Sequence, residues 1–144
     1  MIDQREKKSY QPLLEKEGIS CNSTYLKTGD YGIEGHPDFS IERKELSDLA
    51  QCCGRSRDRF EKELQRAVEL DYFAVIIEGS IQDILKGKYF SKIKPNSVIG
   101  SIFAWSVYYK VPFIFCGDRE TGALAVQKLA RAYLYKKRKE NTKC

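Results

Sequence analysis

The chain has 144 residues, of which 42% are hydrophobic and 31% are charged. This composition is typical of one soluble, folded domain and excludes an intrinsically disordered chain. The formal net charge of +5 at pH 7 fits a polyanionic partner, although net charge bears on association rather than on fold.

The sequence shows neither a membrane span nor a secretory signal. Its longest apolar run, residues 98–109, is shorter than the ~20 residues needed to cross a bilayer. The amino-terminal segment MIDQREKK mixes both charge signs and lacks the apolar stretch of a signal peptide. We therefore expect no membrane partner and an intracellular location, in the cytoplasm or, in a eukaryote, in the nucleus.

Cysteine and histidine limit the possible chemistry. The five cysteines include no C-x-x-C pair and two of them are adjacent, which excludes a disulfide framework and a zinc site. His36 is the single histidine, so histidine acid–base chemistry has little scope. Any catalysis must therefore rest on carboxylates and lysine.

The first part of the chain predicts short strands around one small helix. We expect a strand at residues 1–3, a helix at residues 13–17, and strands at residues 24–30 and 39–44. Two glycines and a proline between the last two strands supply the residues that a turn needs.

The second part predicts strands that alternate with helices. A helix at residues 59–70 precedes the continuously apolar run FAVII at residues 73–77, which is typical of a buried strand. Further helices are expected at residues 96–109 and 118–135, with a strand at 113–116 between them. The alternation predicts an α/β fold, and the early hairpin makes its central sheet mixed.

The segment HPDFSIERKELSD, which begins at His36, contains the pattern of a carboxylate, a gap and then Glu-x-Lys. Many metal-dependent nucleases carry this pattern, so the question is which aspartate completes it. Asp38 and Glu42 on one strand would stand ~13 Å apart, given a rise of ~3.3 Å per residue. Two carboxylates that bind one hard cation must each place an oxygen ~2.0–2.6 Å from it. Asp38 is therefore excluded.

Asp30 satisfies the distance requirement. If residues 24–30 and 39–44 form an antiparallel hairpin that turns around His36, Asp30 faces Glu42 with Cβ atoms ~4.5–5.5 Å apart. Alternate residues of a strand share a face, so Lys44 lies beside Glu42 while Arg43 points the other way. The competing interpretation makes Asp30 a turn residue and Glu42 and Lys44 a solvated strand face, because chance matches to this pattern are common.

Read together, several motifs resemble the nuclease domain of the XPF-type structure-specific endonucleases, the group that includes the Mus and Hef enzymes. The resemblance covers nearly the whole chain, and its most specific element is the Glu-Arg-Lys-x-x-x-Asp pattern. The matching segments are IDQRE at residues 2–6, GDY at 29–31, ERKELSDL at 42–49, the residues 57–60, and IIEG at 76–79.

The resemblance implies a restriction-endonuclease-like fold, of the PD-(D/E)xK type, over residues 1–144 as a single nuclease domain. It implies a DNA endonuclease that uses Mg²⁺ or Mn²⁺ to cut one strand near branches, flaps or single-strand/double-strand junctions, in repair or recombination. Family members generally carry a tandem helix-hairpin-helix module after the nuclease, and we expect none here. The family's homodimer is a further possibility.

Carried over to this sequence, the resemblance assigns the site residues. Asp30 and Glu42 would bind the metal through their side chains, the Arg43 carbonyl would be a further ligand, and Lys44 would be catalytic. The supporting catalytic-site residues would be Asp3, Glu6, Arg43 and Asp48.

The sequence leaves the roles of the supporting residues open. Arg43 could pair with Asp48 or with Glu78, and Asp48 could equally favour the first turn of a helix that begins near residue 45. For Asp3 and Glu6 the alternative is a flexible, charged terminus.

Basic residues between the expected strands and helices are candidates for phosphate contacts, although a solvated loop is the more ordinary interpretation of such a cluster. They are Lys86, Lys88, Lys92 and Lys94.

Two other functions compete with an XPF-type endonuclease. The first is a DNA-binding or dimerisation scaffold that keeps the fold without cutting, although such proteins usually lose the metal carboxylates. The second is another nuclease of the same broad fold, such as a junction resolvase.

Overall fold

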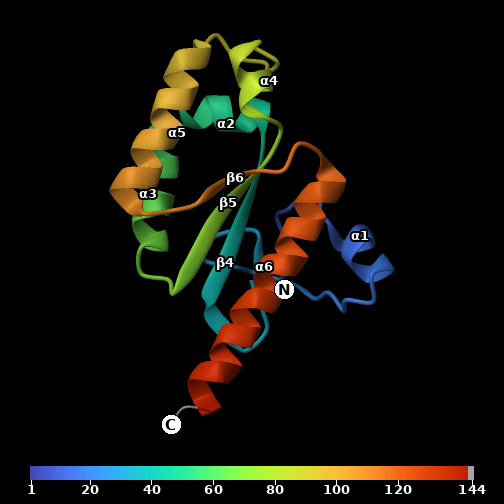
Figure 1. Cartoon of the computed structure of the whole chain (residues 1–144). Helices are drawn as coiled ribbons and strands as arrows, with labels where there is room; N and C mark the ends of the chain where they lie inside the picture. Colours follow the sequence, from blue (N-terminus) through green and yellow to red (C-terminus); the bar gives the residue numbers. More distant parts are fainter. Residues whose placement is uncertain (143–144) are drawn as a thin grey trace.

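A computed structural model gives the structure of the protein and describes residues 1–142. Its centre is one six-stranded sheet in the order β2-β1-β3-β4-β5-β6 (Figure 1). β3 is antiparallel to both β1 and β4, whereas β4, β5 and β6 run parallel, so the predicted mixed sheet is confirmed. The strands are β1 Ile2–Asp3, β2 Ser23–Thr24, β3 Tyr31–Ile33, β4 His36–Glu45, β5 Tyr72–Glu78 and β6 Phe113–Phe115.

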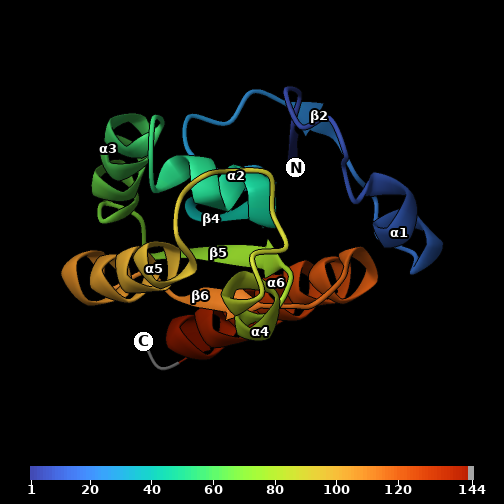
Figure 2. The same cartoon turned by 90° about the horizontal axis from the view of Figure 1, so that it is seen from above.

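Helices cover both faces of the sheet and enclose two hydrophobic cores. α3 and α6 lie on opposite sides of the parallel strands (Figure 2). One core joins α2, α3 and α5 to alternate residues of β5, and the other joins α1 and α6 to β1, β3 and β4. The helices are α1 Gln11–Lys16, α2 Leu46–Cys52, α3 Arg57–Ala67, α4 Ile81–Leu85, α5 Pro95–Tyr109 and α6 Arg119–Thr142.

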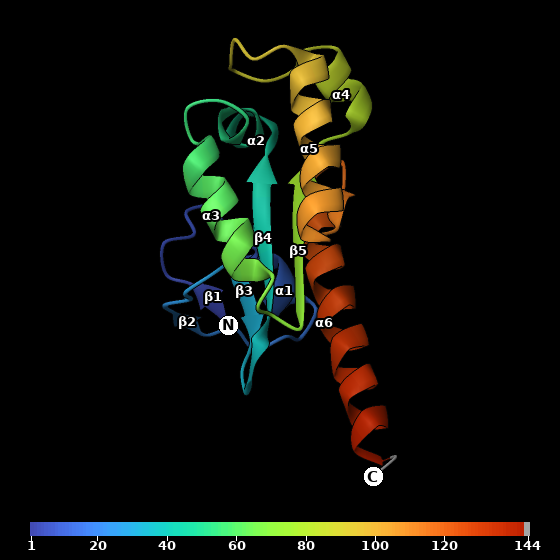
Figure 3. The same ribbon diagram turned by 90° about the vertical axis from the view of Figure 1, so that its left-hand side faces the viewer.

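The parallel strands are connected by helices that pass along the sheet. The chain leaves β4 through α2 and α3 to reach β5, and leaves β5 through α4 and α5 to reach β6. In Figure 3, α3 and α5 lie in front of β4 and β5. This arrangement brings α3 against the strand that carries the Glu-Arg-Lys pattern.

The hairpin register expected from the sequence is confirmed. Tyr31 pairs with Ile41 and Gly32 with Ser40, which is the register in which residue 30 faces residue 42. The register shifts only at the turn, where Ile33 pairs with His36.

The strand predicted at residues 24–30 is wrong, because only Ser23–Thr24 is extended there and the partner of β4 is Tyr31–Ile33. The backbone between them bonds to β1 instead: Asp3 accepts from the Leu26 N–H, and its own N–H donates to the Asp30 carbonyl at 2.8 Å. Gly29 has a φ of +86°, and a Cβ there would lie 2.0 Å from the Ser40 hydroxyl oxygen. A loop therefore replaces the strand and delivers Asp30 to its position.

The remaining expected elements are present, most of them with small changes in their bounds, although β4 begins three residues earlier and α6 ends seven residues later than expected. The helix predicted at residues 59–70 is α3, which begins at Arg57 and ends at Ala67. The two later helices correspond to α5 and α6, and α2 begins at Leu46, close to the expected residue 45. Within residues 1–142, none of the helices combines the length and apolarity that a membrane crossing requires.

Leu64 on α3 is fully buried between the helix and the sheet. We expect Leu64→Ala to lower the free energy of unfolding by about 2–5 kcal/mol, because it leaves a cavity in the core that holds α3 in place. Urea denaturation followed by circular dichroism measures this change. The matched control is Leu124→Ala, whose side chain is half exposed on α6. Equal losses in the two variants would contradict the assignment of Leu64 to the core.

Candidate active site

The centre of the site is β4, whose alternate residues face opposite sides of the sheet. On one side the Lys44 ammonium lies 3.4 Å from a Glu42 carboxylate oxygen. On the other side the Arg43 guanidinium forms ion pairs with Glu6 and Glu78. The alternation expected from the sequence therefore holds for all three residues of the Glu-Arg-Lys pattern.

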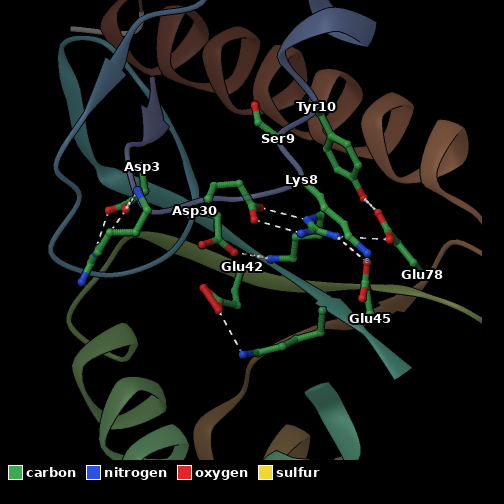
Figure 4. Close-up of polar contacts among 12 residues, drawn as sticks. Asp3, Lys8, Ser9, Tyr10, Asp30, Glu42, Glu45 and Glu78 are labelled. Carbon is green, nitrogen blue, oxygen red and sulfur yellow. Dashed lines mark hydrogen bonds and ion pairs between the residues drawn. The ribbon is translucent and has the colours of Figure 1, made fainter. Parts of the chain in front are cut away.

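Asp30 stands beside Glu42 although it comes from the loop before β3. The Asp30 backbone N–H donates to the Ile41 carbonyl at 2.8 Å. The Asp30 carboxylate accepts a hydrogen bond from the Arg43 backbone N–H, also at 2.8 Å. Figure 4 shows the carboxyl groups of Asp30 and Glu42 next to one another, with Glu78 farther along the network. The constellation of Asp30, Glu42 and Lys44 is thus assembled by backbone bonds to the edge of β4.

Burial raises the pKa values of the Asp30 and Glu42 carboxyl groups and so disfavours their ionised forms. Desolvation raises the pKa of Asp30 to about 6, and the negative charge of Glu6 adds to this effect. Desolvation also raises the pKa of Glu42 well above its ordinary value, with further contributions from Asp30 and Glu63. Crowded, poorly solvated carboxylates of this kind are stabilised when a cation binds between them.

Lys44 keeps its proton in this environment. Burial opposes its charge, but the surrounding carboxylates outweigh that effect, and the Lys44 pKa lies above its ordinary value. The ammonium nitrogen lies 5.2 Å from the centre of the Phe60 ring of α3. Lys44 is therefore a positive charge held between the carboxylates and an aromatic face.

Glu63 of α3 is a site residue that the sequence analysis did not identify. Its charge acts on Glu42 and on Lys44. One of its carboxylate oxygens is buried and has no hydrogen-bond partner among the described residues. The available signal was its position, since helical spacing places residue 63 between the buried Phe60 and Ala67. A charged residue on a buried helix face usually has a partner, and here the partner would be a ligand of the cleft.

Behind β4, Arg43 anchors a nearly buried ion-pair network. Its Nε and Nη2 atoms each donate to a Glu6 oxygen at 2.9 Å, and Nη1 donates to Glu78 at 3.2 Å. The Tyr10 hydroxyl donates to the other Glu78 oxygen. The hydrogen bond with Glu6 is the main reason why the pKa of Arg43 is raised, and burial opposes it. Glu6 thus belongs to a rigid network and not to a flexible terminus.

The structure resolves the other open choices. Arg43 pairs with Glu78, whereas Asp48 is exposed in the first turn of α2 and has no hydrogen bond or ion pair within residues 1–142. Asp3 is 2% exposed and accepts three bonds from Arg5 and one from the Leu26 N–H. The hydrogen bond from the Arg5 side chain is the main reason why the pKa of Asp3 is lowered. Asp3 therefore fixes the loop that presents Asp30.

A cleft of about 630 Å³ opens over this constellation, between α3 and the loop before β3. Asp3, Asp30, Glu42, Lys44 and Glu63 line it. Asp38 is exposed near the start of β4 and does not line the cleft, in agreement with its exclusion. The four expected DNA-binding lysines are exposed in the segment that connects α4 to α5, and they also lie outside the cleft; they are Lys86, Lys88, Lys92 and Lys94.

The cleft residues fit a divalent metal ion held by few protein ligands. Within residues 1–142, no three acidic, histidine or cysteine side chains are arranged as a ready cage. Mg²⁺ commonly binds through one or two carboxylates and keeps several waters, which suits the Asp30 and Glu42 pair. The raised pKa values of that pair and the unpartnered Glu63 oxygen are the features that a nearby cation would relieve.

The mixed sheet and the paired acids beside Lys44 on β4 define a restriction-endonuclease-like domain, as expected from the sequence. The profile of the ERCC4 domain family matches residues 2–129, and the chain belongs to this family. The resemblance seen in the motifs is thereby confirmed.

Solved structures support the same assignment. The chain is similar to XPF from Aeropyrum pernix, with 25% identity and a TM-score of 0.75 over 92% of this chain. It is equally similar to XPF from Aeropyrum pernix in complex with DNA, with 25% identity and a TM-score of 0.74 over 93% of this chain. The match spans 63% and 64% of those two chains. No curated protein sequence matches the chain.

The Arg43 network predicts that the loss of a buried ion-pair network costs far more stability than the loss of an exposed ion pair. We expect Arg43→Ala to lower the free energy of unfolding by about 3–5 kcal/mol, because it leaves the buried carboxylates of Glu6 and Glu78 without their cation. Urea denaturation measures the loss. Lys8→Ala is the control, since Lys8 forms an exposed pair with Glu45 that contributes at most about 1 kcal/mol. A loss below 1 kcal/mol for Arg43→Ala would show that the network is not structural.

The raised pKa of Asp30 predicts that this residue lowers the free energy of unfolding in a pH-dependent way. Because its folded-state pKa is raised to about 6, its contribution favours folding below the unfolded value of 3.8 and is lost as pH rises through 6. Without metal, Asp30→Asn should therefore be more stable than the wild type at neutral pH, by up to about 3 kcal/mol. The difference should close below about pH 4. Urea denaturation in EDTA at both pH values tests this, and a pH-independent difference would contradict it.

Proposed function

We propose that the chain is a Mg²⁺- or Mn²⁺-dependent DNA endonuclease that acts as a single nuclease domain over residues 1–144. The observation that carries this proposal is the assembly of Asp30, Glu42 and Lys44 at one cleft, with both acids held by the backbone of β4 and its neighbours. Membership of the ERCC4 domain family and the similarity to an XPF structure in complex with DNA support the substrate.

In this proposal Asp30 and Glu42 hold the metal through their carboxylates, and the Arg43 carbonyl is a further ligand. A bound divalent ion supplies an acidified water and polarises the scissile phosphate. Asp3 and Glu6 position the ligands, since Asp3 fixes the loop of Asp30 and Glu6 fixes Arg43. Asp48, which is exposed on α2, would support the site from a greater distance or contact the substrate.

Lys44 supplies charge neutralisation in this mechanism. Phosphodiester hydrolysis develops negative charge on the non-bridging oxygens, and a fixed ammonium stabilises that charge. The raised pKa of Lys44 favours this electrostatic role over proton abstraction, because the group is charged at neutral pH. Its contact with Phe60 and its ion pair with Glu42 restrict where the ammonium can point.

The preferred substrates are proposed to be branched, flap or single-strand/double-strand junction DNA, in repair or recombination. This part of the proposal rests on the family, as does the proposed homodimer. The exposed lysines at 86, 88, 92 and 94 would contact DNA phosphates outside the cleft. The proposed location is intracellular, in the cytoplasm or, in a eukaryote, in the nucleus. Light scattering tests the dimer, and cleavage products on a panel of branched DNAs separate flap cutting from junction resolution.

A non-catalytic scaffold remains the alternative function. Its carboxylates would have no metal to bind, so Mn²⁺ titration should show no saturable site that depends on Asp30. The buried acids argue against a scaffold, because they raise the energy of the folded state unless they serve a ligand.

Lys44→Ala should abolish nicking. With labelled flap or forked DNA and Mg²⁺ or Mn²⁺, the wild type should give nicked products, and the variant should lose at least about 10²-fold in rate because a charge-stabilising group is gone. Gel analysis of the products measures the rate.

Asp38→Asn is the matched control for Asp30→Asn. Both remove one carboxylate, but Asp38 is exposed at the far end of β4, so only Asp30→Asn should lose nicking and Mn²⁺ binding. Nicking that survives both Asp30→Asn and Lys44→Ala would refute the proposed site.

A further inference from the structure

Four basic side chains at the mouth of the cleft have no role in the mechanism above. They are Lys7, Lys27, Arg59 and Arg66, and all four line the cleft and are exposed. Ion pairing does not account for them, because no ion pair involves any of the four within residues 1–142. Arg5, the remaining basic residue of the rim, is already paired with Asp3. The cleft thus carries four uncommitted positive charges around an acidic floor.

We propose that these four residues form a binding track for the phosphate backbone of the DNA strand that is cut. This inference rests on the proposed function and adds the place where the substrate lies. The floor of the cleft carries the carboxylates of Asp30, Glu42 and Glu63, which repel a phosphate that enters without a counter-charge. Cations at the rim offset that repulsion and hold the backbone at the mouth of the site.

The spacing on α3 fits an extended polyanion. Arg59 and Arg66 are separated by seven residues, or about 10.5 Å along the helix axis, and lie on the same helix face. Glu63 lies between them on that face and points into the cleft. A backbone that contacts both arginines would therefore pass directly over the acidic floor.

The track continues beyond the active-site cleft. Lys27 and Arg66 also line a neighbouring cavity of about 490 Å³ between the loop 24–28 and the end of α3. The exposed ring of Tyr25 lines the same cavity and stacks on the Arg5 guanidinium at 4.7 Å. The two hollows share Lys27, Thr28 and Arg66, so they form one groove along α3. A chain of phosphates can follow this groove from the active site toward the end of α3.

The decisive experiment measures binding and its salt dependence without cleavage. Fluorescein-labelled forked DNA is titrated with the full chain in EDTA at several KCl concentrations, and anisotropy gives the association constant. For Arg59→Ala/Arg66→Ala, the slope of log K against log salt should become shallower by about 1.4–1.8, because each lost phosphate contact contributes roughly 0.7–0.9. Affinity should fall at least about tenfold near 0.1 M KCl.

The matched control is Lys62→Ala/Arg138→Ala. It removes the same charge from α3 and α6, but both residues are exposed and lie outside the cleft. Alanine favours helix, so neither double variant should unfold its helix, and circular dichroism checks this. The control should keep the wild-type slope. Equal slopes for the wild type and the cleft variant, or equal changes in both double variants, would overturn the inference.

The outcome is separable from the test of the nuclease. If the Arg59→Ala/Arg66→Ala variant loses salt-dependent binding but the wild type never nicks DNA, the binding track is supported and the proposed nuclease activity is refuted. If the wild type nicks DNA but the slope of log K against log salt is unchanged in the cleft variant, the nuclease activity is supported and the binding track is refuted. Wild-type protein that shows no salt-dependent binding to the fork would also remove the track.

Discussion

The structure depends on the way in which Arg43 is held in β4. Its side chain is clamped by Glu6 and Glu78 on one side of the sheet, with 7% of its surface exposed, and its backbone N–H binds Asp30 at the edge of the other. One residue thus links the amino-terminal segment, the end of β5 and the loop that carries an acid of the cleft. Glu42 and Lys44, its neighbours in sequence, inherit fixed positions from this arrangement because alternate strand residues share a face.

The front of β4 shows the opposite energetic balance. Asp30, Glu42 and Glu63 lie together at a poorly solvated site, and among residues 1–142 Lys44 is the cation that lies within this group. Such a cluster lowers the stability of the folded protein. It forms nevertheless because the ion pairs and hydrogen bonds around Arg43 fix the backbone that carries these side chains. A cation that binds between these carboxylates would stabilise the site. The buried carboxylates lower the stability of the folded protein, and the ion pairs of the Arg43 network compensate for that loss.

Much of this arrangement was predictable from the sequence, and the exceptions have physical causes. The hairpin register and the strand alternation followed from the turn residues and the Glu-Arg-Lys pattern, so Asp30 could be preferred over Asp38. The strand expected at residues 24–30 failed because the Asp3 side chain and the Gly29 backbone form contacts that no local pattern encodes. Glu63 was missed because it lies on α3, and the packing of α3 against β4 cannot be inferred from the local sequence pattern.

The central claim is that Asp30 and Glu42 together hold one divalent ion. Crystals soaked in Mn²⁺ and measured with anomalous diffraction test it directly, since the metal gives a signal that protein atoms lack. We predict a peak ~2.0–2.6 Å from a carboxylate oxygen of each residue. Absence of that peak at saturating Mn²⁺, or a peak bound by only one of the two acids, would contradict the account.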